Sequence, residues 1–114
     1  MNHPISLIQL TGLRVLGTRH SAKRIRKLVS EVLDEDGAAT VDFSSVTLTQ
    51  SFADELLGPL LLAHGPSLLK QLSFKSCSED ARAVITFVVG QRLRDFHEHN
   101  NLERRETGGN LSVA

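Results

Sequence analysis

Short β-prone runs alternate with helical stripes of apolar residues along most of this chain, and this alternation limits the folds open to it. Segments with apolar residues spaced three and four positions apart, as on one face of a helix, begin near Ser21, Ser51 and Ser76. The β-prone runs lie at residues 5–10, 13–17, 39–46 and 71–75. Strands that alternate with helices favour a parallel sheet with right-handed crossovers. We therefore predict a small α/β fold of order β(β)αβαβα, with a mostly parallel sheet and helices packed mainly on one face.

Turn and capping residues predict where the early elements begin and end. We expect the first two β-prone runs to pair through a turn at residues 11–12. Gly37 follows the last apolar position of the first helix and fits its C-terminal cap. Pro59 has no N–H to donate, so we expect it to kink the second helix or to end it near Gly58.

The third helix sets the predicted domain boundary. Ser76 and Glu79 form an S-x-x-E capping box at its start, and its apolar stripe continues to about residues 97–100. The sequence that follows is polar and contains glycine. We predict a domain at residues 1–100 and a polar tail at residues 101–114.

Length, charge and composition exclude several classes of function. The 114 residues fit one ordinary domain, and no apolar run is long enough to span a bilayer. The net charge is zero and the chain has no Trp or Tyr, which argues against binding to membranes or nucleic acid. The single Cys77 and the absence of a signal peptide predict a reducing, cytoplasmic setting. We expect no enzymatic activity, no cofactor and no metal.

The junction at residues 49–58, TQSFADELLG, joins the third β-prone run to the second helix. Ser51 fits the N-cap position, and Asp54 can act as its reciprocal partner three residues later. Phe52 and Glu55 are not needed for capping, so the surface that they form is our candidate docking site for a protein partner. The predicted partner-binding residues are Thr49, Gln50, Ser51, Phe52, Asp54 and Glu55.

The first helix carries its charges at the ends that a helix dipole disfavours. Cations crowd its positive N-terminal end, whereas Glu31, Asp34 and Glu35 lie at its negative C-terminal end. A solvated helix face is the simpler interpretation. The alternative is a patch that binds an anion or an acidic partner, and this predicted patch consists of Arg19, Lys23, Arg24, Arg26 and Lys27.

The order of elements and one long motif resemble a known family. VDFSSVTLTQSFADELLG at residues 41–58 resembles the STAS-like domains, whose name comes from sulfate transporters and anti-sigma-factor antagonists. It is most similar to a STAS-like family of bacterial proteins with a DFSxV strand followed by SFADEL, and LGTRHSAKRIRKLV at residues 16–29 also looks like that family. The resemblance covers about residues 5–97. It implies a signalling role and a partner with a histidine-kinase-like ATPase domain.

The resemblance also implies a phosphorylation site. In the anti-sigma-factor antagonists a D-S-S-G loop follows the strand, and a partner kinase phosphorylates its second Ser. Aligned without gaps, the Asp of that loop falls on Gln50, its first Ser on Ser51 and the phosphorylated Ser on Phe52, which has no hydroxyl. A shift of one residue would place the modified hydroxyl at Ser51.

Our leading hypothesis is a non-enzymatic regulatory module that binds its partner through residues 49–58. Two other functions stay open. Arg94, Asp95 and His99 of the RDFHEH segment fit the R-D-x3-H pattern of HEPN-type ribonucleases, which are all-helical bundles. A nucleic-acid-processing component would use this segment or the basic patch at residues 19–27. A structural subunit would instead form a homodimer through an exposed sheet edge.

Overall fold

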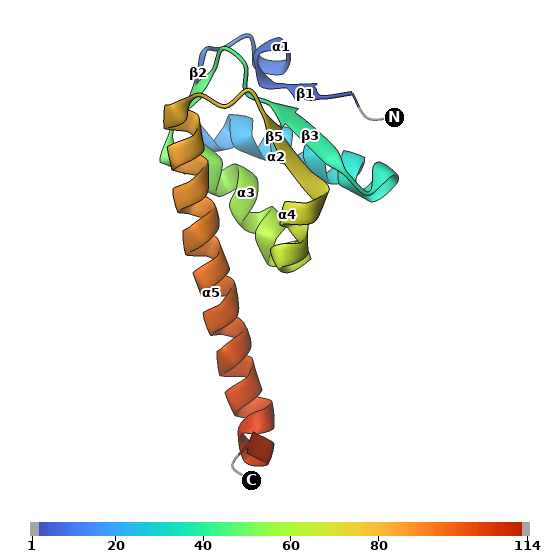
Figure 1. Cartoon of the computed structure of the whole chain (residues 1–114), viewed down its shortest axis with the longest axis vertical. Coiled ribbons are helices and arrows are strands. Elements are labelled where there is room, and N and C mark those ends of the chain that lie inside the picture. The colour runs from blue at the N-terminus through green and yellow to red at the C-terminus, as the bar shows by residue number, and fades with distance from the viewer. Residues whose placement is uncertain (1–2, 113–114) are drawn as a thin grey trace.

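The computed structural model describes residues 3–112 of the chain (Figure 1). Side chains are described up to residue 98. In chain order the elements are β1 (Ile5–Ser6), α1 (Leu7–Thr11), β2 (Val15–Leu16), α2 (Arg19–Asp36), β3 (Ala39–Asp42), β4 (Thr47–Leu48), α3 (Gln50–His64), the 3-10 turn η1 (Gly65–Ser67), α4 (Leu68–Gln71), β5 (Leu72–Lys75) and α5 (Glu79–Ser112).

All of the strand pairs in the described residues are parallel, as predicted. β3 is the central strand of a three-stranded sheet of order β1-β3-β5, with Val41 beside Ile5 on one side and Phe74 on the other. β2 and β4 form a separate two-stranded sheet. Within each sheet the strands follow one another in chain order, and successive strands of the chain alternate between the two sheets.

The two faces of the three-stranded sheet differ in burial, which confirms that the helices cover mainly one face. Ala39 and Val41 of β3 are buried, whereas Thr40 and Asp42 between them are partly exposed. Side chains alternate across a strand, so the buried positions lie on one face. That face packs against the apolar stripe of α2, and α3 packs in turn against α2 and α5.

The N-terminal segment departs from the prediction. Residues 5–10 are not one strand: β1 has two residues, and α1 follows it directly. The hydroxyl of Ser6 caps α1 by accepting a hydrogen bond from the backbone N–H of Gln9, and Gly12 ends the helix with φ of 69°. β2 then pairs with β4 instead of β1, so the predicted pairing of the first two runs is wrong.

The caps of the later helices lie close to the predicted residues but coincide with them only for α2. Gly37 ends α2 with φ of 77°, and its N–H bonds to the carbonyl of Leu33, as predicted. The cap of α5 is Ser78, whose hydroxyl accepts from the N–H of Ala81 at 3.0 Å. The predicted Ser76 instead has φ of 59° in the preceding loop, so the S-x-x-E capping box is wrong.

The cap of α3 is Thr49, and Ser51 is not a cap. The Thr49 side chain accepts a hydrogen bond from the backbone N–H of Phe52 at 3.2 Å. The N–H of Thr49 also bonds to the carbonyl of Leu16, which continues the pairing of β4 with β2 and keeps the backbone extended up to this residue. The helix therefore cannot begin before Gln50, and Ser51 lies inside its first turn.

α3 continues through Pro59 to His64, which is contrary to the predicted end near Gly58. Proline leaves the carbonyl four residues earlier without a backbone donor, and here that carbonyl belongs to Glu55. Arg26 of α2 supplies the missing donor, because its Nη1 lies 2.7 Å from the Glu55 carbonyl oxygen. A neighbouring helix thus satisfies the group that the proline frees.

α5 is longer than predicted. It packs along α3 over its N-terminal half and then extends well past the rest of the chain (Figure 1). The predicted end near residues 97–100 falls inside the helix, which continues to Ser112. The division into a domain at 1–100 and a tail at 101–114 stays a prediction.

The capping assignment can be tested with two alanine variants. Thr49→Ala should cost about 0.5–2 kcal/mol of stability, because it removes the acceptor for the Phe52 N–H. Ser51→Ala should change stability by less than about 0.5 kcal/mol, since Ser51 is exposed. Urea denaturation of both variants measures the difference. A larger loss in Ser51→Ala than in Thr49→Ala would contradict the cap.

Candidate functional site

The structure divides the predicted docking residues into four groups. Thr49 is the exposed N-cap of α3, and its hydroxyl accepts the Phe52 N–H. Gln50 and Ser51 are exposed on the first turn of α3. Phe52 is fully buried in the core, so it cannot contact a partner and is removed from the predicted surface. Asp54 and Glu55 are partly exposed and point toward neighbouring helices, where arginines bind them.

Asp54 joins α3 to α5 through a two-point ion pair with Arg92. The Arg92 Nε lies 2.8 Å from one carboxylate oxygen and its Nη2 lies 2.6 Å from the other. This bidentate geometry is the strongest arrangement for an arginine–carboxylate pair. The hydrogen bond to Asp54 raises the pKa of Arg92. Gly58 makes room for this contact, because a Cβ at that position would lie 3.1 Å from the Arg92 Nε.

Glu55 joins α3 to α2 in a similar way. The Arg26 Nη1 lies 2.5 Å from the Glu55 carboxylate, and the same nitrogen bonds to the Glu55 carbonyl. Arg19 adds a longer contact of 3.3 Å to the carboxylate. The hydrogen bond from Arg26 is the main reason that the pKa of Glu55 is lowered. The two neighbouring acids of the SFADEL motif therefore hold α3 between two other helices.

The predicted basic patch is not a single surface. Arg26 and Arg19 pair with the α3 acids, so they are separated from the other three cations by their contacts. Lys23, Arg24 and Lys27 are exposed and make no ion pair among the described residues. The unfavourable placement of cations at the start of α2 is thus partly explained by tertiary pairing with α3.

A polar cleft of about 420 Å3 lies between the first turn of α3 and the middle of α5. Its lining combines two arginines and two carboxylates with two amides and one hydroxyl. Such a lining suits hydrogen bonds to polar or charged side chains, and it offers little apolar surface. The cleft is lined by Arg19, Gln50, Ser51, Asp54, Gln91, Arg92 and Asp95.

Sequence reasoning missed the α5 side of this cleft. Arg92 and Gln91 lie on the polar side of the third helical stripe, where a pattern cannot distinguish a solvated residue from one that binds another helix. One signal was present in the sequence, because Gly58 lies inside an otherwise apolar helical run. A glycine in a helix interior often marks a close approach by another group, which here is Arg92.

The DFSS segment before the junction forms a turn. One carboxylate oxygen of Asp42 accepts hydrogen bonds from the hydroxyl of Ser44 at 2.6 Å and from its N–H at 2.9 Å. These bonds lower the pKa of Asp42. Ser45 follows with φ of 64°, and the chain then enters β4. This part of the motif therefore has a structural role, because it directs the chain from one sheet to the other.

The RDFHEH segment lies on α5, and its residues Asp95 and Phe96 line a pocket together with Pro59 and Leu62 of α3. Arg94 and His97 are exposed, and Asp95 lies 3.8 Å from Arg92 in an i,i+3 ion pair. The His99 side chain lies outside the described residues, so the predicted pairing of Arg94 with His99 is untested.

Among the described side chains, no three His, Cys, Asp or Glu residues are grouped to hold a metal ion. Partial burial raises the pKa of the Cys77 thiol, which makes it less reactive.

These observations define a small α/β domain with parallel strands, an acidic pair that joins three helices, and a polar cleft at the start of α3. The family model for the STAS-like domain of unknown function matches residues 21–82, which is more than half of the chain. The chain therefore belongs to this family. No curated protein and no solved structure matched it in the same comparisons. No helix in the described residues is long and apolar enough to cross a membrane.

The role of Glu55 gives a pH-dependent prediction. Its pKa is lowered in the folded state, so its carboxylate contributes stability that is fully present above the unfolded pKa, about 4.3 for Glu. That contribution is lost as pH falls through the folded pKa. Glu55→Gln should therefore be less stable than wild type at pH 7, and the difference should shrink below about pH 4. Urea denaturation at both pH values measures it. A difference that stays constant with pH would contradict the pairing with Arg26.

Proposed function

We propose that this chain is a non-enzymatic regulatory module that binds a protein partner through the polar cleft at the start of α3. The observation that carries the proposal is a set of neutral side chains without partners inside the cleft. Gln50, Ser51 and Gln91 line it, and none of their side chains makes a hydrogen bond among the described residues. A partner can therefore use their donors and acceptors without breaking contacts that hold the fold together.

The charged frame of the cleft supports the same proposal. Among the arginines of these ion pairs, Arg19 and Arg92 are the most exposed, with 55% and 38% of their side chains accessible. Charges of both signs at the rim of an interface orient a partner and disfavour the binding of other proteins. Their effect on specificity is larger than their effect on affinity. The STAS-like resemblance supports a partner of the histidine-kinase-like ATPase class.

Ser51 is our proposed point of control. Its hydroxyl is exposed and free of capping, because Thr49 caps the helix. A phosphate on Ser51 would lie at the positive end of α3 and in the same cleft as Arg19 and Arg92. It would compete with Asp54 for both arginines. Phosphorylation would then change the charge that a partner meets and would weaken the link between α3 and α5.

A matched pair of variants tests the docking surface. Gln50→Ala combined with Gln91→Ala should weaken partner binding at least about tenfold, because it removes two hydrogen-bonding groups. Gln9→Ala removes an exposed glutamine on α1, away from the cleft, and should leave binding unchanged. The measurement is quantitative pull-down of the partner that co-purifies with the full chain from its native host. Equal capture by both variants would overturn the proposed docking site.

The same assay tests the role of Ser51. Ser51→Asp adds a negative charge and should change partner binding, whereas Ser51→Asn has nearly the same shape without the charge and should not. Mass spectrometry of the native chain should detect a phosphate on Ser51. Identical binding by the two variants, together with an unmodified Ser51, would remove the control point and leave the docking proposal standing.

A further inference from the structure

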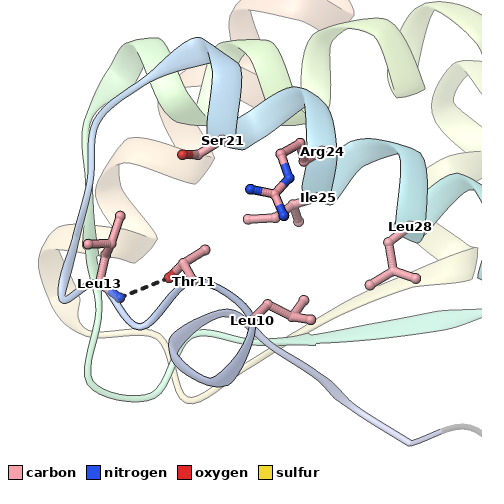
Figure 2. Close-up of a pocket in the computed structure, with 7 residues that line it drawn as sticks. All are labelled: Leu10, Thr11, Leu13, Ser21, Arg24, Ile25 and Leu28. Atoms are coloured by element: carbon pink, nitrogen blue, oxygen red, sulfur yellow. Dashed lines mark hydrogen bonds between the residues drawn. The ribbon is translucent and has the colours of Figure 1, made fainter.

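A second pocket lies between α1 and α2, on a part of the molecule that the proposed function does not use. It has a volume of about 240 Å3, and α1, the following loop and one face of α2 form its walls. Figure 2 shows the side chains around it. The lining residues are Leu10, Thr11, Leu13, Ser21, Arg24, Ile25 and Leu28.

Most of this wall is aliphatic and open to solvent. Leu10 and Leu13 are each 49% exposed, which is a large apolar area for two neighbouring leucines at a surface. Leu28 extends from α2 toward the side of Leu10, and the buried Ile25 lies beside Arg24 on the same helix (Figure 2). An apolar group that filled the space would remove these side chains from water.

Arg24 is the single charged group in the lining. In Figure 2 its guanidinium extends from α2 toward the α1 side of the pocket. Arg19 and Arg26 on the same helix pair with acids of α3, but Arg24 makes no ion pair or hydrogen bond among the described residues. Its donors are therefore available to a ligand in the pocket.

The remaining polar groups limit the chemistry of that ligand. The Thr11 hydroxyl donates to the Leu7 carbonyl and accepts from the Leu13 N–H, and the Ser21 hydroxyl bonds to Thr18. One free guanidinium matches a carboxylate, which it can bind through two parallel hydrogen bonds. A phosphate carries more charge and more acceptors than this site can satisfy.

We propose that the pocket between α1 and α2 binds a short aliphatic monocarboxylate, with the carboxylate on Arg24 and the chain against Leu10, Leu13 and Leu28. The volume supports a ligand of this size. A dry cavity of roughly 150 Å3 accommodates benzene in another protein. The pocket here is larger and open on one side, so a chain of about six carbons fits beside the guanidinium.

The test uses the full chain and follows the methyl resonances of Leu10, Leu13, Ile25 and Leu28 by NMR during titration with hexanoate. We expect saturable shifts of these methyl groups, with a Kd on the order of a millimolar. Hexan-1-ol has the same chain without the charge and should bind at least about tenfold more weakly. Arg24→Gln should weaken hexanoate binding by a similar factor. Lys27→Gln removes an exposed cation of the same helix outside the pocket and should have no effect.

Several outcomes would overturn the proposal. They are equal binding of hexanoate and hexan-1-ol, unchanged binding by Arg24→Gln, and inorganic phosphate shifting the same methyl groups more strongly than hexanoate. The absence of saturable shifts, or shifts confined to the α3 cleft, would also overturn it. If the pocket methyl groups shift on dilution and sedimentation shows a dimer, a second copy of the chain covers the pocket and the proposal is wrong. The ligand comparison on the wild-type chain does not depend on the folding of any variant.

Discussion

The carbonyl of Glu55 lies inside α3 without a backbone donor, because the residue four positions later is Pro59. The Arg26 Nη1 takes the place of that donor at 2.7 Å and binds the Glu55 carboxylate as well. An interior proline without such compensation costs about 3 kcal/mol and breaks or kinks the helix. A side chain from α2 thus allows α3 to continue past the proline. The same contact fixes the position of α2 against α3.

The position of α5 depends on the residues just before this proline. Asp54 binds Arg92 in a bidentate pair, and Gly58 leaves the space that the guanidinium needs. The SFADELLGP segment is therefore chiefly a set of helix-to-helix contacts. Its acids are counter-ions for arginines of the same chain, and only the outermost residues of the first turn are left to face a partner.

The parts of the structure that depend on local patterns were predictable from the sequence. The apolar stripe of α2, its end at Gly37 and the central β3 strand all follow from periodicity and capping within a few residues. The wrong prediction of one strand at residues 5–10 has a local cause. ISLIQL is too short for its apolar pattern to separate a strand from a helix, and the capping signals Ser6 and Gly12 decide the matter.

The ion pairs could not be predicted in this way. Asp54 and Arg92 are 38 residues apart, and Glu55 and Arg26 are 29 apart, so only the packed fold brings each pair together. The prediction of the α3 N-cap was wrong for a related reason. Thr49 and Ser51 are both suitable caps, and the choice between them is made by the pairing of β4 with β2. Long-range contacts override local preference at each of these points.

A double-mutant cycle between Arg26 and Pro59 tests the central claim most directly. Pro59→Ala restores a backbone N–H for the Glu55 carbonyl, and Pro59 is exposed, so the change leaves no cavity. Arg26→Gln removes the substitute donor, while the carboxylate contact is lost equally in both backgrounds. Arg26→Gln should destabilise the wild-type protein by about 1 kcal/mol or more beyond its effect in the Pro59→Ala background. Effects that add within about 0.3–0.5 kcal/mol would contradict the account.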